Sequence, residues 1–343
     1  MKDYVKKISI KDVAKKAGVS MQTISNYLNN RVVVSDKLKD KIKKAINKLE
    51  YTPNVIAKSL RTGKSHMIGV LIPEIENPFY SSIITGIQEK ADSKGYTIIL
   101  EFNNYENDKL QKDIIELSKY VDGIIICTNI VKEENIKKIY DKKVKIVGID
   151  FSTKKELFPI IEADNYNAAY KGVKYLINMG HKNIYYISEP LEIKTIEDRW
   201  RGFKDCLIDH KIYYDENKIF IDKRLQLDKI KIGEEIIINY KDKIKTPAAI
   251  FGTSDLIIIG AMKAIENLGY LIPKDVSFLG YDNIYFSNYT KPPLSTIEMP
   301  TKKMGMLAVE LLIDSLYEKR PNRKKLLLKT RMVERESVAK LEY

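Results

Sequence analysis

The chain has 343 residues and a mass of 39.6 kDa, enough for two or three domains with well-buried cores. Hydrophobic residues make up 44% of it and charged residues 31%, as in a soluble globular protein, and no apolar run is long enough for a membrane-spanning helix. The first residues contain no signal-peptide core, and Cys127 and Cys206 stand far apart, so we expect a cytoplasmic protein without disulfides.

The positive charge is concentrated at the start of the chain. Residues 1–65 hold 16 Lys and Arg against 5 Asp and Glu, a balance of +11, whereas the remaining residues hold 43 against 41, a balance of +2. A uniformly lysine-rich composition does not explain this asymmetry. We therefore expect a basic, phosphate-binding region at the start of the chain, followed by a nearly neutral body.

Three short helices are predicted within residues 9–50. Ser9, followed by Asp12, is a variant of the capping box that begins a helix, and Gly18 ends that helix. Ser20 can cap the second helix. The third helix keeps apolar residues at helical spacing and carries lysines on its other face. Two short helices joined by a tight turn that contains Gly are typical of a helix-turn-helix.

The second helix carries a face of short polar side chains. Ile24 and Leu28 are four residues apart and give the helix one apolar side. Amides and hydroxyls on the rest of such a helix can read base edges in a DNA major groove. An ordinary solvated face is the alternative for this helix taken alone. The residues off the apolar side are Met21, Gln22, Ser25, Asn26 and Asn29.

Three consecutive stretches resemble the N-terminal signature of the lac repressor (LacI/GalR) family of bacterial transcriptional regulators. They read I-K-D-V-A-K-K-A-G-V-S-M-Q-T-I-S-N-Y-L-N, V-S-D-K-L-K-D-K-I and L-E-Y-T-P-N-V-I-A-K-S-L-R-T-G-K. The resemblance implies a helix-turn-helix domain over residues 1–50, a hinge helix and linker over 51–65, and an effector-binding and dimerisation domain over 66–343. It also implies a homodimer that binds a palindromic double-stranded DNA operator and a small-molecule effector.

The same resemblance implies roles for individual residues of the second helix and the hinge. Met21 and Gln22 are expected to face bases, with Asn26 one turn further on. Asn26 stands where the family commonly has Arg, and Asn favours adenine where Arg favours guanine, so we expect an A·T pair at that place in each half-site. Expected phosphate contacts are Thr23, Ser25, Asn29, Lys58 and Arg61, and expected minor-groove contacts of the hinge are Ala57 and Leu60.

The hinge, residues 51–65, has room for only a short helix. Pro53 disfavours helical geometry in the residue before it and so ends the third helix. A helix of about two turns is marginal in isolation, and we expect it to fold only when DNA is bound. A plain polar linker is the alternative.

From Met67 onwards, short apolar runs alternate with amphipathic helices. Such runs indicate parallel sheets covered on both faces, and two series of them predict two doubly wound subdomains with a ligand between them, at the carboxyl ends of the strands. This is the periplasmic-binding-protein-like architecture of the family. The expected strands are 67–73, 96–101, 123–128, 145–150, 183–188, 248–252 and 276–282.

Each of the two subdomains is expected to contain two separate segments of the body. The first is predicted to take about residues 66–163 and 294–323, and the second about 164–293 and 324–340. In this arrangement the segment 291–297 returns to the first subdomain, and a final strand, 325–334, belongs to the second.

Aromatic and charged residues follow several of the predicted strands. Aromatic faces can stack on the C–H faces of a sugar while charged groups bind its hydroxyls. An Asp that merely caps the next helix is the alternative reading of each strand end. In similar regulators, residues matching Tyr80, Asp150, Arg199 and Asp282 contact a sugar or nucleobase. The expected effector contacts are Phe79, Tyr80, Asp150, Phe151, Arg199, Ser254, Asp255 and Asp282, with Ser254 at a place often held by Asn.

The sequence thus predicts a cytoplasmic, dimeric repressor controlled by a sugar or sugar derivative. A purine or a partner-protein corepressor is the alternative within the same architecture. A carbohydrate-binding or carbohydrate-active protein without a role on DNA is the alternative from another class. Common nucleotide-binding, zinc-protease and serine-hydrolase motifs do not occur, and we expect no enzymatic activity, no metal and no cofactor.

Overall fold

The computed structural model describes residues 8–28, 35–51, 63–128, 144–151, 157–317 and 325–342. The chain forms two compact units, residues 1–65 and 66–343, which we call the head and the body and describe separately. Within the described ranges, none of the helices has the length and apolar character needed to cross a membrane.

The described part of the head consists of three helices around one small core. They are α1 (Ile10–Ala17), α2 (Met21–Leu28) and α3 (Asp36–Lys48). The Asp12 carboxylate accepts hydrogen bonds from the backbone N–H and the hydroxyl of Ser9, at 2.9 and 2.6 Å, which completes the expected capping box. Gly18 ends α1 with a φ of 68°, a backbone conformation that favours Gly. The core residues are Val13, Ala14, Ala17, Ile24, Ile42, Ala45 and Tyr51.

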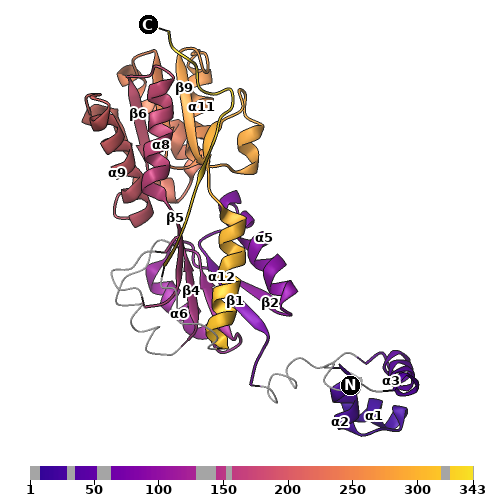
Figure 1. The fold of residues 1–343 in the computed structure, drawn as a ribbon. Coiled ribbons are helices and arrows are strands. Elements are labelled where there is room, and N and C mark those ends of the chain that lie inside the picture. Colours follow the sequence, from indigo (N-terminus) through magenta and orange to yellow (C-terminus); the bar gives the residue numbers. More distant parts are fainter. Residues whose placement is uncertain are drawn as a thin grey trace, which may run out of the picture. The chain divides into compact units, whose positions relative to one another are not determined.

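The first sheet of the body has the order β11-β5-β4-β3-β1-β2, and every neighbouring pair of these strands is parallel. Helix α6 (Asn107–Leu117) covers one face, while α5 (Pro78–Ser93) and α12 (Thr301–Leu316) cover the other and lie against each other (Figure 1). The strands are β1 (Met67–Ile72), β2 (Thr97–Phe102), β3 (Gly123–Ile126), β4 (Ile146–Ile149), β5 (Ile160–Ala163) and β11 (Lys325–Leu328).

The second sheet has the order β12-β10-β9-β8-β6-β7, and only β12 runs antiparallel among these strands. One face is covered by α8 (Asn165–Asn178) and α9 (Lys194–Asp209), the other by α10 (Lys229–Tyr240) and α11 (Asp255–Asn267). The strands are β6 (Ile184–Ser188), β7 (Ile219–Ile221), β8 (Ala248–Gly252), β9 (Val276–Asp282), β10 (Ser295–Glu298) and β12 (Arg331–Val333). Four 3₁₀ segments are described: η1 (Glu216–Lys218), η2 (Lys223–Gln226), η3 (Lys241–Lys243) and η4 (Tyr285–Asn288).

These observations confirm the expected fold class of a helical head followed by two doubly wound sheets. The seven predicted strands are all present, with ends within about two residues of the expected ones. Three further strands, β5, β7 and β10, were not predicted as strands. All are short, and a run of three or four residues carries little periodicity.

Two predicted segments of the subdomains were wrong. β10 pairs with β9, so residues 295–298 remain in the second sheet and the chain returns to the first subdomain only at α12. The expected final strand, 325–334, is two strands, because β11 pairs with β5 in the first sheet and β12 with β10 in the second. Lys329 and Thr330, between these two strands, carry the chain from one sheet to the other.

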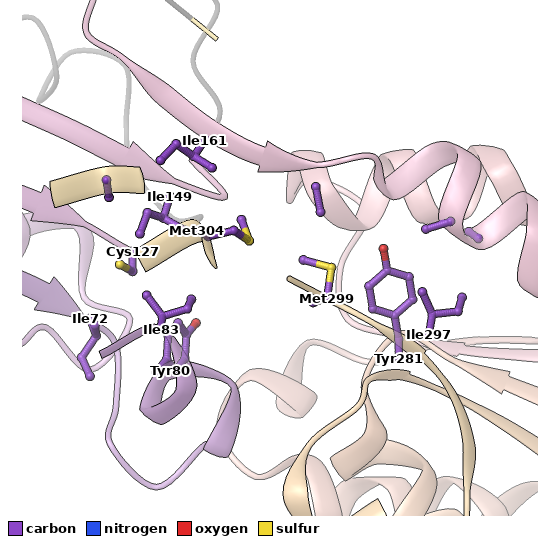
Figure 2. Packing of buried hydrophobic residues seen from close by; sticks show 14 of the residues in the cluster. Ile72, Tyr80, Ile83, Cys127, Ile149, Ile161, Tyr281, Ile297, Met299 and Met304 are labelled. Atoms are coloured by element: carbon purple, nitrogen blue, oxygen red, sulfur yellow. The ribbon is translucent and has the colours of Figure 1, made fainter. Parts of the chain in front are cut away.

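One buried cluster continues from the first sheet to the second. Met299, on the segment that leads from β10 to α12, belongs to the same cluster as Tyr281 and Ile297 of the second sheet and Met304 of α12 (Figure 2). Unbranched methionines fill irregular space and tolerate repacking better than branched side chains. The connection between the subdomains is therefore apolar and adaptable.

Candidate functional site: a polar helix face in the head and a charged cleft in the body

The head presents the polar face of α2 to solvent. The Met21 side chain is 51% exposed, and Gln22 beside it is exposed as well. The Gln22 side-chain Nε2 donates a hydrogen bond to the Asn26 Oδ1, at 3.0 Å, so the two amides form one unit. Ser20 caps the helix as predicted, because its hydroxyl accepts a hydrogen bond from the Thr23 N–H at 3.1 Å.

Ser25 is not part of this exposed face. Its exposed fraction is 5%, although we predicted a phosphate contact. Ser25 follows Ile24, which is fully buried in the head core. The predicted phosphate contact at Ser25 is therefore corrected, and the contact predicted for Thr23 stays a prediction.

The two other described helices of the head carry exposed lysines. Those of the described part of the head are exposed on α1 and α3, where they can approach phosphates without reading sequence. The expected contacts Asn29, Ala57, Lys58, Leu60 and Arg61 lie outside the described residues. The exposed lysines are Lys11, Lys15, Lys16, Lys37, Lys39, Lys41, Lys43, Lys44 and Lys48.

In the body, Arg199 of α9 is held by the ends of several other elements. Its Nε donates to the Asn165 Oδ1 at 2.8 Å, and its Nη1 donates to the Thr253 carbonyl oxygen at 2.5 Å. Its guanidinium carbon lies 3.7 Å from the centroid of the Tyr281 ring. These contacts fix the plane of a buried cation at the carboxyl edge of the second sheet.

Carboxylates surround that cation. Burial works against the charged form of Arg199, yet the neighbouring acidic groups, Tyr281, Asp282 and Asp150 foremost, raise its pKa. Burial raises the pKa of Asp150 to about 6, in spite of the opposing effect of Arg199. Burial also raises the pKa of Asp282 well above its usual value. Arg199, Asp150 and Asp282 thus come together as predicted.

Asp150 and Asp282 both have unusual backbone conformations. Their φ angles are 48° and 117°, in the region that non-glycine residues rarely adopt. Asp150 Oδ1 accepts a hydrogen bond from the Ala163 N–H at 3.3 Å, whereas no described residue donates one to the Asp282 carboxylate. Strained residues of this kind cluster at ligand-binding sites, because surrounding structure must hold them in place.

A second ion pair lies beside this group and was not predicted. Lys229, the first residue of α10, pairs with Glu189, which follows β6, and their side chains are 13% and 7% exposed. The Thr253 hydroxyl donates a further hydrogen bond to Glu189. Burial would raise the pKa of Glu189, but Lys229 and Thr253 outweigh it and lower that pKa. The sequence signal was Glu189 at a strand end, the position already used to select Asp150 and Asp282.

Two predicted effector contacts belong to the protein interior. The Asp255 carboxylate accepts hydrogen bonds from the Ile284 N–H, the Ser287 hydroxyl and the Thr296 hydroxyl, at 2.9, 2.6 and 2.5 Å. It therefore ties α11 to the segment after β9 and to β10. Phe151 packs in the core beneath α6, with its ring centroid 5.3 Å from that of Phe158. Neither side chain is available to a ligand.

Ser254, Phe79 and Tyr80 complete the predicted set. The Ser254 hydroxyl is buried and has no hydrogen-bond partner among the described residues. Phe79 and Tyr80 form an edge-to-face pair with centroids 5.2 Å apart, and Tyr80 is buried beside Tyr105. Tyr105 in turn donates to the Glu74 carboxylate at 2.8 Å. Tyr80, Tyr105 and Glu74 therefore form a line of neighbouring polar side chains in the first subdomain.

A cavity of ≈ 860 Å³ lies between the two subdomains. The first subdomain contributes Glu74 and Tyr105 to its lining, and the second contributes Lys229. Its volume is within the range of cavities that hold small molecules. Two aromatic side chains, Phe286 and Tyr289, form part of the wall on the side of the second subdomain.

Comparison with known proteins places these features in a family. Residues 9–54 match the model for bacterial regulatory proteins of the lacI family, and residues 173–338 match a periplasmic-binding-protein-like domain. The chain is 36% identical to the HTH-type transcriptional regulator RegA of Clostridium acetobutylicum over 335 residues, which is 96% of this chain and 98% of RegA.

Two solved structures resemble the chain over most of its length. One is the lac repressor dimer bound to operator and the anti-inducer ONPF, with 25% identity, a TM-score of 0.82 and coverage of 97% of this chain and 100% of that one. The other is a LacI-family transcriptional regulator from Enterococcus faecium with bound ribose. It has 27% identity, a TM-score of 0.71 and coverage of 80% of this chain and 100% of that one.

Proposed function

We propose that this chain, which belongs to the lacI family of bacterial transcriptional regulators, is a repressor that binds a palindromic operator. A sugar or sugar derivative, bound between the two body subdomains, controls its affinity for that operator. The repressor acts in the cytoplasm as a homodimer and catalyses no reaction. The alternatives are a purine effector, a partner-protein corepressor, and a carbohydrate-binding or carbohydrate-active protein without a role on DNA. The experiments below distinguish each of them from the proposed function.

The observation that supports the DNA-binding part is the hydrogen-bonded amide pair Gln22–Asn26 on α2, in a head whose other helices carry exposed lysines. Amide side chains on a helix of this kind suit direct readout of base edges, and lysines supply sequence-independent attraction to phosphates. Affinity should therefore come largely from the lysines, and sequence choice from α2.

Control by an effector is supported by the cavity between the subdomains and by a separate group of buried charged side chains that does not line it. Arg199, Asp150 and Asp282 come from both subdomains and meet at the carboxyl edges of the sheets, where ligands bind in doubly wound folds. A ligand that bridges them would favour one relative orientation of the subdomains. That preference can be passed to the hinge, residues 51–65, and change the population of its DNA-binding form. The regulator with bound ribose is a structural neighbour that takes a sugar.

Dimer formation is supported by similarity alone, because the lac repressor neighbour is described as a dimer bound to operator. The exposed aromatic side chains Phe286 and Tyr289, with Leu227, line the cavity between the subdomains, and we assign them to that cavity.

The decisive experiment measures binding of the full chain to operator candidates by fluorescence anisotropy at several salt concentrations. We expect affinity to fall steeply as salt rises, because each neutralised phosphate releases counterions. A chain of residues 66–343 should lose DNA binding and keep effector binding. DNA binding by that shorter chain, or affinity that is indifferent to salt, would contradict the proposed head.

A panel of sugars, purines and candidate partner proteins then tests the effector. A ligand of the folded state raises the melting temperature of the body and should also change operator affinity. A purine or a protein that does both, in place of any sugar, would replace the proposed effector class and leave the DNA-binding role intact.

A further inference from the structure

In the described part of the body, the chain passes from one subdomain to the other three times. These crossings lie between β5 and α8, between β10 and α12, and between β11 and β12. The first and the third are joined, because the Asp164 N–H donates a hydrogen bond to the Leu328 carbonyl oxygen at 3.0 Å. A change in the relative orientation of the subdomains must alter the backbone at these crossings, since the rest of each subdomain is a sheet packed between helices.

Asn165, the first residue of α8, is buried at the first crossing. Its Nδ2 donates to the carbonyl oxygen of Ala163, the last residue of β5, at 3.1 Å. Its Oδ1 accepts from the Arg199 Nε at 2.8 Å and from the Tyr281 hydroxyl at 3.0 Å, and both donors belong to the second subdomain. One amide side chain therefore ties the end of the first sheet to α9 and β9.

Arg199 extends these contacts toward the cavity between the subdomains. Its Nη1 donates to the Thr253 carbonyl oxygen at 2.5 Å. The Thr253 hydroxyl donates to the Glu189 carboxylate, which in turn pairs with Lys229. The contacts thus run without a break from a cavity wall to a crossing, and of the residues that make them only Lys229 lines the cavity. We call this series the relay: Lys229, Glu189, Thr253, Arg199 and Asn165.

Burial couples the members of the relay to one another. Thr253 is fully buried, and Glu189 and Arg199 are each 6% exposed. Hydrogen bonds in such a setting are stronger than in water and strengthen one another. A broken contact would leave a buried group without a partner, which costs stability, so a shift of one member favours a shift of the next. A ligand in the cavity can start such a shift, because a group that binds Lys229 competes with Glu189 for it.

We propose that the relay couples the cavity to the relative orientation of the two subdomains, with Asn165 as the member that acts on the crossing. A ligand that contacts Lys229 weakens its pair with Glu189, and the change reaches the backbone of Ala163 through Asn165. This inference rests on the proposed function and deepens it, because it names the residues through which a ligand would alter operator binding. Asn165 acts through Arg199 and is a positioning residue.

Hydrogen exchange of the full chain, without ligand or DNA, tests the relay. The Ala163 N–H donates to the Asp150 Oδ1, and the Asp164 N–H donates to the Leu328 carbonyl oxygen, so exchange of these two amides reports opening of the crossing. The N–H of Val70, in the middle of the buried strand β1, is the reference for unfolding of the body. Mass spectrometry gives the ratio of the exchange rates at the crossing and at the reference.

Lys229→Gln removes the charge at the cavity end of the relay and should raise this ratio by about fivefold, the lower end of typical coupling between sites. Lys263→Gln is the matched control, because Lys263 of α11 pairs with Glu234 of α10 outside the relay, and it should leave the ratio unchanged. Asn165→Ala should raise the ratio by itself, and adding Lys229→Gln to that chain should raise it no further.

A role of Lys229 in overall stability alone would raise the exchange of Val70 and of the crossing together and leave their ratio unchanged. If Lys229→Gln fails to fold, as judged by circular dichroism, Thr253→Val replaces it. That variant removes the hydroxyl that donates to Glu189 and keeps the carbonyl oxygen that accepts from Arg199. It should raise the ratio in the same direction.

Two results would overturn the inference: a ratio unchanged in a folded Lys229→Gln or Thr253→Val chain, or an effect of Lys229→Gln that is equal with and without Asn165. Failure of the proposed function looks different. In that case the exchange ratios would follow the expected pattern, while the full chain failed to bind DNA or the relay variants left its operator affinity unchanged.

Discussion

The Gln22 Nε2 donates a hydrogen bond to the Asn26 Oδ1, at 3.0 Å, across one turn of α2. This contact leaves the Asn26 Nδ2 and the second lone pair of its Oδ1 for a base. An Asn arranged in this way matches the donor and acceptor that adenine presents in the major groove. We therefore propose that this local contact on α2 contributes to the choice of operator sequence.

Asn26→Ala should remove the preference for adenine at one position of each half-site, at a cost of about 1–3 kcal/mol of discrimination. Binding-site selection followed by anisotropy on single-base variants measures it. Asn47→Ala, at an exposed position on α3, is the control and should leave the preference unchanged. Guanine at that position in both the natural chain and the variant would refute the assignment.

Asp255→Ala should destabilise the body without changing which ligand it binds. The change leaves the Ile284 N–H and the Ser287 and Thr296 hydroxyls without their buried acceptor, and we expect a loss of roughly 3 kcal/mol in the free energy of unfolding. Urea denaturation measures it. The exposed Asp242→Ala should be nearly neutral. A stable Asp255→Ala chain that has lost ligand binding would restore Asp255 to the effector site.

Stability should depend on pH through Asp150. Burial raises the pKa of Asp150 in the folded chain to about 6, from an ordinary value of 3.8. Because the folded chain binds the proton more tightly, the stability that protonation contributes is complete below pH 3.8. It is lost as the pH rises through 6. Relative to an Asp150→Asn chain, the natural chain should therefore gain roughly 1 kcal/mol between pH 7.5 and pH 5.

Denaturation of both chains at the two pH values, without ligand, gives this difference directly. A difference that keeps the same value at pH 5 and pH 7.5 would show that Asp150 titrates outside this window. A difference that changes in the opposite direction would show that Arg199 stabilises its ionised form more than burial disfavours it.

Arg199→Met should be among the most damaging substitutions in the body. It leaves the Asn165 Oδ1 and the Thr253 carbonyl oxygen without their donor and leaves Asp150 and Asp282 without the cation between them. We expect a loss of about 3 kcal/mol, because buried acceptors lose their donor and the neighbouring buried acids lose a positive charge. Arg201→Met, at an exposed position on the same helix, should cost less than about 1 kcal/mol. Equal losses for the two variants would contradict this account of Arg199.

Local patterns were enough to predict the head and most strands of the body. The capping box at Ser9, the cap at Ser20 and the period of the apolar residues depend on neighbours within one or two turns, and the structure has all of them. Near-continuous apolar runs likewise predicted buried parallel strands, because such strands are covered on both faces.

Only the folded chain could separate residues that look alike in sequence. Asp255 and Asp282 both lie at strand ends, yet the Asp255 carboxylate accepts three hydrogen bonds from within the protein. Among the described residues, only the backbone carbonyl of Asp282 accepts one, from the Met299 N–H. Phe151 directly follows Asp150 but packs in the core beneath α6. The two carboxylates differ because residues far away in sequence, such as Thr296, donate hydrogen bonds to the Asp255 carboxylate.

The same reason explains what was missed. The Glu189–Lys229 pair joins positions 40 residues apart, and the pairing of β11 with β5 joins segments further apart still. Periodicity and capping describe contacts along the chain, whereas contacts between distant segments depend on how sheets and helices pack. The sequence therefore specified the helix-turn-helix and the type of fold, and packing selected which charged side chains come together in the body.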